Sequence, residues 1–224
     1  NLGFDDLAIP ALEAALALRR EPLGDDHPDT LERLIDLSSS HRYAGRTDEA
    51  EPYLLEALDG QRRILGDEHP ETLETLSLLG VLRYRQSRLK ESEDTLREVI
   101  GLRRRVLGAD HPRTLDSINS LGLTLVRRDR LDEAEALLVE AMEGRRRQLG
   151  AQHPRTIDSE SNVGRVWLGL DREDEAEPLL RRVFEARRRQ YGDEHGLVQQ
   201  AARALAAALR GLGRNPEASA LLAE

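Results

Sequence analysis

Apolar residues recur along this chain at the three- and four-residue spacing of an amphipathic helix, and they do so in pairs of segments. In the stretch 115–125, the positions on one helical face are Leu115, Ile118, Leu121, Gly122 and Leu125. After a short break, a second face is made by Ala134, Leu138, Ala141 and Met142. The pattern predicts two helices joined by a turn.

The whole pattern repeats every 42 residues. A Leu-Gly or Tyr-Gly pair marks each copy, at positions 23–24, 65–66, 107–108, 149–150 and 191–192. Three residues after each glycine stands a histidine, at His27, His69, His111, His153 and His195. A block Asp-Glu-Ala-Glu recurs in the same register at 48–51, 132–135 and 174–177. Such a register excludes chance and predicts a repeat protein.

The residues between the helical segments fit helix ends. Proline follows the first four histidines, where the first helix of a copy starts and a missing N–H costs least. The turn inside each hairpin carries residues that tolerate a left-handed backbone, namely Gly45, Ser87, Asp129, Asp171 and Gly213. One hairpin cannot bury its apolar faces alone, so neighbours must stack on it. The sequence therefore predicts an all-α fold, a right-handed superhelical solenoid of antiparallel helix hairpins.

The 42-residue register also predicts where each repeat begins and ends. We expect a single array over 1–224, with a partial repeat (second helix only) at 1–23 and a truncated last repeat at 192–224. Complete repeats are expected at 24–65, 66–107, 108–149 and 150–191. Incomplete terminal repeats would expose apolar faces, which favours end-to-end self-association.

Composition and charge narrow the chemistry. The chain has no cysteine, which excludes disulfides and thiol nucleophiles, and its net charge of −9 argues against nucleic acid or an anionic membrane as the main partner. No apolar run reaches the roughly 20 residues of a membrane-spanning helix. Residues 1–6 have neither the basic start nor the apolar stretch of a signal peptide, so we expect a cytoplasmic location. The missing initiator Met indicates a piece of a longer protein.

The small and large residues of each copy resemble the tetratricopeptide (TPR) pattern, and the 42-residue form resembles the kinesin-light-chain type. The motifs that carry this are Leu-Gly-Asp-Glu-His-Pro-Glu-Thr-Leu at 65–73 and Glu-Ala-Glu-Pro-Leu at 175–179. The resemblance implies an accessory binding segment, of the kind that bacteria append to signalling kinases and nucleotide-driven sensors. That family usually has paired asparagines in the first helix, which hold the backbone of a bound peptide. Here only Asn119 and, at a neighbouring position, Asn162 correspond to them.

Identity across copies separates construction from specificity, because a residue present in every copy is expected to build the repeat itself. One such column, near the ends of the second helices, is Arg20, Arg62, Arg104, Arg146 and Arg188. Another, beside the hairpin turns, is Arg46, Arg88, Arg130, Arg172 and Arg214. We interpret them as cations paired with nearby acids, such as Asp25 and Asp67, rather than as a phosphate-binding ladder. The histidines stand a full repeat apart and cannot share a metal ion. We expect them to pack or hydrogen-bond at helix starts, and we expect no metal and no cofactor.

Specificity is expected where copies differ along the first helices, which line the concave face of such a stack. The candidate peptide-binding residues are Arg42, Tyr43, Ser77, Tyr84, Arg85, Asn119, Leu123, Arg127, Ser161, Arg165 and Arg203. With Arg210, the arginines among them form a basic stripe that suits an acidic or carboxylate-bearing segment. The alternative is a solvated face with internal salt bridges. Recurrent acids at the starts of these helices are expected to be helix-dipole partners, at Glu32, Glu74, Asp116 and Asp158.

Two single residues carry separate expectations. Trp167 shares a column with Leu125 and Leu209, which predicts that it packs. Glu160 stands in a column that is otherwise Leu34, Leu76, Ile118 and Ala202. Since an unpaired buried carboxylate is costly, we predict that Glu160 meets an arginine or reaches solvent.

Two functions use the same surface and both stay open. The first is a protein-interaction scaffold that binds a peptide or helix of a partner in the concave groove. The second is a sensor or regulatory segment of a larger multidomain signalling protein, a kinase or a nucleotide-binding sensor, which binds in cis or reads an effector peptide. An enzyme is not expected, because the chain has no Gly-rich phosphate loop, nucleophile elbow or zinc motif.

Overall fold

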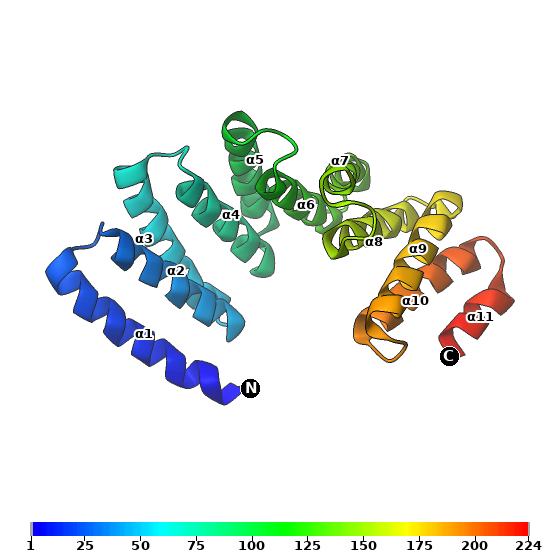
Figure 1. The fold of residues 1–224 in the computed structure, drawn as a ribbon, viewed down its shortest axis with the longest axis horizontal. Coiled ribbons are helices and arrows are strands. Elements are labelled where there is room, and N and C mark those ends of the chain that lie inside the picture. The colour runs from blue at the N-terminus through cyan, green and yellow to red at the C-terminus, as the bar shows by residue number, and fades with distance from the viewer. Residues whose placement is uncertain (1, 224) are drawn as a thin grey trace. The chain divides into compact units, whose positions relative to one another are not determined.

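The computed structural model describes residues 2–223, and it describes the side chains of residues 9–222. Within this range the secondary structure is entirely helical (Figure 1). The helices are α1 (Leu2–Leu23), α2 (Pro28–Tyr43), α3 (Thr47–Leu65), α4 (Pro70–Arg85), α5 (Leu89–Val106), α6 (Pro112–Arg127), α7 (Leu131–Leu149), α8 (Pro154–Gly169), α9 (Glu173–Tyr191), α10 (Gly196–Gly211) and α11 (Asn215–Ala223). The all-α prediction is confirmed.

The chain forms two compact units, Asn1–Ala109 with α1 to α5 and Asp110–Glu224 with α6 to α11. Inside each unit, helices that follow one another in sequence pack side by side. In the second unit the first helices of successive copies also touch, α6 against α8 and α8 against α10. Contacts restricted to neighbouring elements are what a stacked repeat requires.

A glycine in three of the first helices, α4, α6 and α8, lets the two helices of a hairpin approach closely. A Cβ added at Gly122 would lie 2.6 Å from Cγ of Leu138, and one added at Gly164 would lie 2.7 Å from Cγ of Leu180. Both leucines are fully buried. The glycine of the repeat is therefore explained by packing of a large residue against a missing side chain.

The five recurrent histidines are the N-caps of the first helices. In each copy the Nδ1 atom accepts the backbone N–H two residues later, at 3.2 Å. An N-cap side chain satisfies one of the amide donors that a helix start leaves unpaired. The expectation of hydrogen bonding at the helix start is confirmed. The described residues contain no cluster of side chains that could hold a metal ion.

The turn inside each hairpin has the left-handed backbone that its residue types predict. Ser87, Asp129 and Asp171 have φ of 62°, 59° and 54°, and Gly45 and Gly213 occupy the same position in their copies. Short polar residues and glycine tolerate this region best. The turn chemistry and the helix ends were thus correctly predicted.

Candidate protein-binding face

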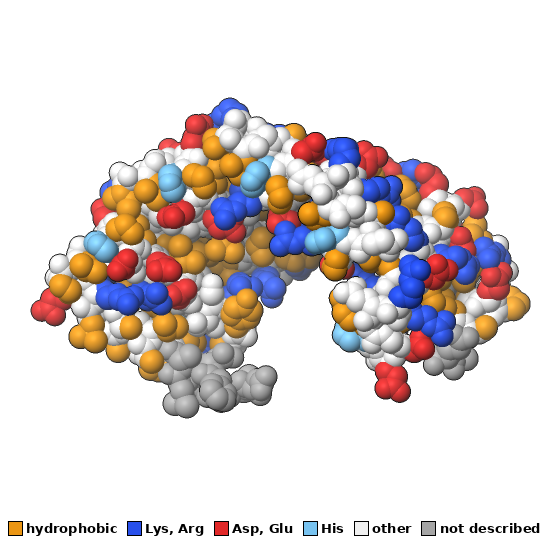
Figure 2. Space-filling model, viewed as in Figure 1, with side chains coloured by type: hydrophobic (Ala, Val, Ile, Leu, Met, Phe, Trp, Pro, Cys, Tyr) orange, Lys and Arg blue, Asp and Glu red, His pale blue; other side chains and the backbone are white. Residues whose placement is uncertain are grey.

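Most arginines of this chain form ion pairs or hydrogen bonds within the fold. In the column near the ends of the second helices, Arg20, Arg62 and Arg188 form ion pairs with an acid of the following loop, Asp25, Asp67 and Asp193 respectively. The surface consequently shows Lys or Arg beside Asp or Glu over much of both units (Figure 2). The interpretation of this column as paired helix-end cations is confirmed.

Three of the arginines beside the hairpin turns, Arg88, Arg172 and Arg214, are each held by two carboxylates. Arg88 pairs with Glu91 on its own helix and with Glu51 of the preceding second helix. Arg172 does the same with Glu175 and Glu135, and Arg214 with Glu217 and Glu177. The hydrogen bond from each arginine lowers the pKa of the carboxyl three residues later, at Glu91, Glu175 and Glu217. These guanidinium groups interlock successive copies and are not available to a partner.

A third set of arginines is buried, which the sequence reasoning missed. Arg103 is 1% exposed and donates from Nη2 to Glu74 at 2.6 Å. The equivalent pairs are Arg145 with Asp116 at 2.6 Å and Arg187 with Asp158 at 2.9 Å. The recurrent acids at the first-helix starts are therefore partners of buried arginines, more than helix-dipole partners. The signal was present in the sequence as two charge columns that recur together, 29 residues apart.

The candidate residues of the first unit lie on α2 and α4. Tyr43 is 72% exposed, and the guanidinium of Arg42 lies 4.4 Å from the centre of its ring. Tyr84 is half-buried and Arg85 is exposed. Ser77 is half-buried and accepts from Nη1 of Arg103 at 3.4 Å, so it belongs partly to the scaffold. This face combines aromatic rings with a cation.

Of the candidate residues on α6 and on the first half of α8, Asn119 is engaged in a contact between the two helices. Asn162 donates from Nδ2 to Oδ1 of Asn119 at 3.1 Å, which links the two helices. Leu123 is half-buried and Arg127 is exposed. Ser161 is only 5% exposed, because α8 lies between neighbouring helices there. It offers little surface to a peptide, contrary to its place among the predicted groove residues.

Arg165 on α8 and Arg203 and Arg210 on α10 resemble Arg85 in having no partner, and they lie on first helices that pack against each other. Each is exposed, and none forms an ion pair or hydrogen bond with the residues that the structure describes. All three stand at positions where the copies differ. They leave unpaired positive charge on the first helices of the second unit.

Trp167 and Glu160 both behave as predicted. The Trp167 ring is half-buried against the core, and its Nε1 donates to Glu135 at 2.7 Å. Glu160 is fully buried and pairs with Arg146 and Arg182. The expectation that Glu160 meets an arginine is confirmed.

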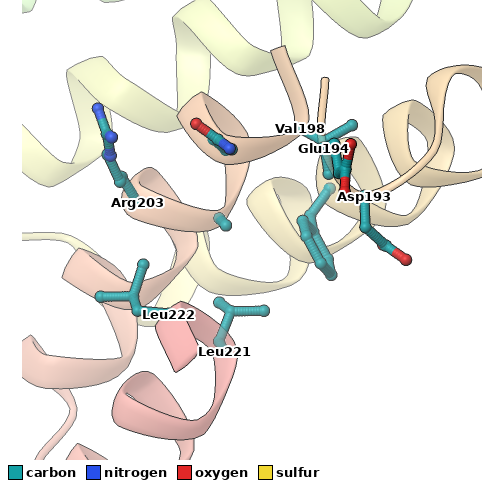
Figure 3. Close-up of a pocket in the computed structure, with 9 residues that line it drawn as sticks. Asp193, Glu194, Val198, Arg203, Leu221 and Leu222 are labelled. Atoms are coloured by element: carbon teal, nitrogen blue, oxygen red, sulfur yellow. The ribbon is translucent and has the colours of Figure 1, made fainter. Parts of the chain in front are cut away.

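A cavity of about 330 Å³ lies in the last copy, between α9, α10 and α11 (Figure 3). Its lining includes Leu221 and Leu222 of α11 on one side and Asp193, Glu194 and Val198 on the other. Its walls combine the carboxylates of Asp193 and Glu194 with apolar side chains, and the described residues include no cluster there that could hold a metal ion.

Comparison with known proteins agrees with this architecture. The family model described as tetratricopeptide repeat matches residues 1–62, 37–105, 81–146 and 117–188. No curated protein sequence matches the chain. No helix among the described residues is long and apolar enough to cross a membrane.

Several solved structures share the fold. A protein of Podosopora anserina classed provisionally as a kinesin light chain, with nearly identical TPR-like repeats, superposes with a TM-score of 0.76 at 24% identity, over 88% of this chain and 93% of that one. BtubC (BKLC) from P. vanneervenii gives 0.83 at 18% identity, over 98% and 88%. RapI in its apo form gives 0.72 at 12% identity, over 96% and 88%. At these identities the likeness shows the fold, which this chain shares with a kinesin-light-chain-like TPR array, and the predicted tetratricopeptide repeat is confirmed by the family model.

Proposed function

Because this chain belongs to the tetratricopeptide repeat family, whose repeats are generally protein–protein interaction modules, we propose that it is a scaffold that binds a peptide or a helix of a partner protein on the face made by its first helices. The fold is typical of non-enzymatic scaffolds. A regulatory segment of a larger signalling protein would use the same face for a segment in cis.

The observation that carries the proposal is the contrast among the arginines. Arginines in columns common to the copies are paired with carboxylates, whereas Arg165, Arg203 and Arg210 have no partner among the described residues. A chain with net charge −9 has many acids that could neutralise a cation. Three cations left without them on the adjacent first helices α8 and α10, at positions that differ between copies, favour this face as a surface whose charge serves something other than folding.

The partner that fits this face carries carboxylates. A guanidinium group binds a carboxylate in a bidentate arrangement that combines charge with geometry. Arg165 and Arg203 lie on α8 and α10, which are packed against each other in the second unit. We therefore propose an acidic segment, or a segment ending in a free carboxylate, as the ligand of α8 and α10.

A peptide-library selection tests the proposal, with the parent chain compared with Arg165→Glu, Arg203→Glu and Asn119→Ala. Arg189→Glu is the matched control, since Arg189 is exposed, makes no ion pair with described residues and lies on the second helix α9. We expect acidic peptides to be enriched. Each charge reversal on the face should weaken their binding about tenfold to a hundredfold, as the loss of a charge-assisted hydrogen bond implies.

The binding should also weaken with added salt, because the charges are exposed. If no peptide is enriched, the scaffold proposal fails. If the peptides bind Arg165→Glu and Arg203→Glu as well as the parent, or if Arg189→Glu weakens binding equally, the assignment to α8 and α10 fails.

A further inference from the structure

Three columns of the repeat meet where one second helix, the next first helix and the next second helix come together. The first column is arginine in every copy, as at Arg62 and Arg146. The second is apolar, as at Leu76, except for Glu160. The third is glutamate at Glu56, Glu98 and Glu140, and arginine only at Arg182. The two exceptions stand in the same copy.

Where the columns follow the rule, the arginine bonds directly to the glutamate. Arg62 on α3 donates from Nη2 to Oε1 of Glu98 on α5 at 3.1 Å. Arg20 pairs with Glu56 in the same manner. The apolar residue between them, Leu76 on α4, is buried and takes no part in the pair.

Where the rule is broken, the buried position supplies the missing acid. Glu160 on α8 accepts from Nη2 of Arg146 on α7 at 2.7 Å. It accepts also from Nε and Nη2 of Arg182 on α9, at 3.0 and 2.5 Å. Arg182 donates further to the carbonyl of Ala151 at 2.7 Å. One fully buried carboxylate therefore ties three helices together.

Each exception would be unfavourable without the other. Arg182 opposite a leucine would leave two guanidinium groups facing each other with no acid between them. Glu160 opposite a glutamate would set two carboxylates against one arginine, one of them buried. Buried charges are tolerated only when they are paired, and removal of one partner is strongly destabilising.

We infer that Glu160 and Arg182 form a pairing code that selects which second helix closes on α8. A first helix with Glu at this position accepts a second helix with Arg, and a first helix with Leu accepts one with Glu. In an array of nearly identical interfaces, such a code distinguishes one interface from the rest, which is the best-attested use of a buried polar group. The code makes the interface of α7, α8 and α9 different from the equivalent interfaces of the other copies.

A double-mutant cycle in the whole chain tests the code with Glu160→Leu, Arg182→Glu and the two together. We expect each single variant to lower the folding equilibrium constant about tenfold to a hundredfold, and the double variant to return within about threefold of the parent. Unfolding is followed by helical circular dichroism and by the emission of Trp167, the only tryptophan, whose bond to Glu135 reports the seating of α8 on α7. Glu185→Leu, at an exposed position of α9, is the control and should change little.

The same Glu–Arg pairing should also work when it is introduced into another copy of the repeat. Leu76→Glu and Glu98→Arg stand at the equivalent positions of the first unit, beside Arg62. Each alone is expected to destabilise, and the two together should be better tolerated than the sum of their separate effects predicts. This transplant leaves Glu160 intact, so it stays informative if a single variant of the second unit does not fold. Additive effects in both cycles would overturn the inference.

Discussion

The two units use the same repeat but place charge differently. At positions 62, 76 and 98 the first unit has an arginine and a glutamate paired at the surface over a buried leucine. At positions 146, 160 and 182 the second unit has two arginines that share one buried carboxylate. This comparison indicates that the unusual residue at position 160 is stable because position 182 is also unusual and compensates for it.

The first helices of the two units also differ in the side chains that they expose. The first unit presents Tyr43 and Tyr84 together with Arg42 and Arg85, whereas the second presents Arg165, Arg203 and Arg210 without a tyrosine beside them. The copies also differ inside, since Gln61 occupies in its copy the column that holds the buried Arg103, Arg145 and Arg187 in the next three. One backbone pattern thus carries two surfaces of different chemistry, and variants can test how independent the two units are.

The largest effect is expected from truncating the matched leucines Leu96 and Leu180. Each is fully buried against a first-helix glycine, Gly80 and Gly164 respectively. Leucine-to-alanine changes in a core cost about 2–5 kcal/mol. In a repeat array the loss of stability affects mainly the neighbouring helices. Leu180→Ala should therefore shift the Trp167 unfolding transition more than Leu96→Ala does, and hydrogen exchange should show Leu96→Ala releasing amides of α4 and α5 first. Equal loss of protection throughout the chain after either change would show that the units unfold together.

A smaller effect is expected at the buried arginine column. Arg145→Gln removes the donors to Asp116 and to Oγ of Ser159 and should cost about 1.5–3 kcal/mol, as for hydrogen bonds to charged groups. The reverse change, Gln61→Arg, gives Glu32 a second partner besides Arg33 and removes the unpaired Oε1 of Gln61, so it should stabilise the first unit by about 1 kcal/mol. Urea unfolding of each variant measures the change in its free energy of unfolding. Destabilisation by Gln61→Arg would mean that the first copy does not provide the space for this side chain.

The smallest changes in stability are expected at two glycines, one packed against a leucine and one with open space beside it. Gly122→Ala forces a Cβ to within 2.6 Å of Leu138 and should cost about 1–3 kcal/mol by overpacking. Gly101 lies inside α5 with nothing within 4 Å of an added Cβ. Gly101→Ala should stabilise by about 0.5–1 kcal/mol, because alanine is the better helix former. Thermal unfolding checks both, and equal signs for the two variants would contradict the packing explanation.

Local features were predictable because their causes are local. The N-cap histidines, the left-handed turn residues such as Asp129, and the close glycines all follow from helix-end and packing chemistry that a fixed period displays. The pairing of Glu160 followed from the cost of an isolated buried carboxylate. The burial of Arg103 was missed because a charged residue near a helix end is ordinarily exposed. Only its recurrence with an acid at a fixed distance could have indicated otherwise.

The 42-residue period by itself determined the family, the helices, their ends and the order in which they pack, since each of these depends on residues within one or two copies. The tertiary structure decided which charges are free. Whether an arginine is paired depends on side chains brought beside it from other helices, as Glu160 is brought to Arg182. Composition along the chain does not contain that information. The same packing buried Ser161 and left Arg165 exposed four residues later, which is why the scaffold could be derived from the sequence and the binding face could only be proposed from the structure.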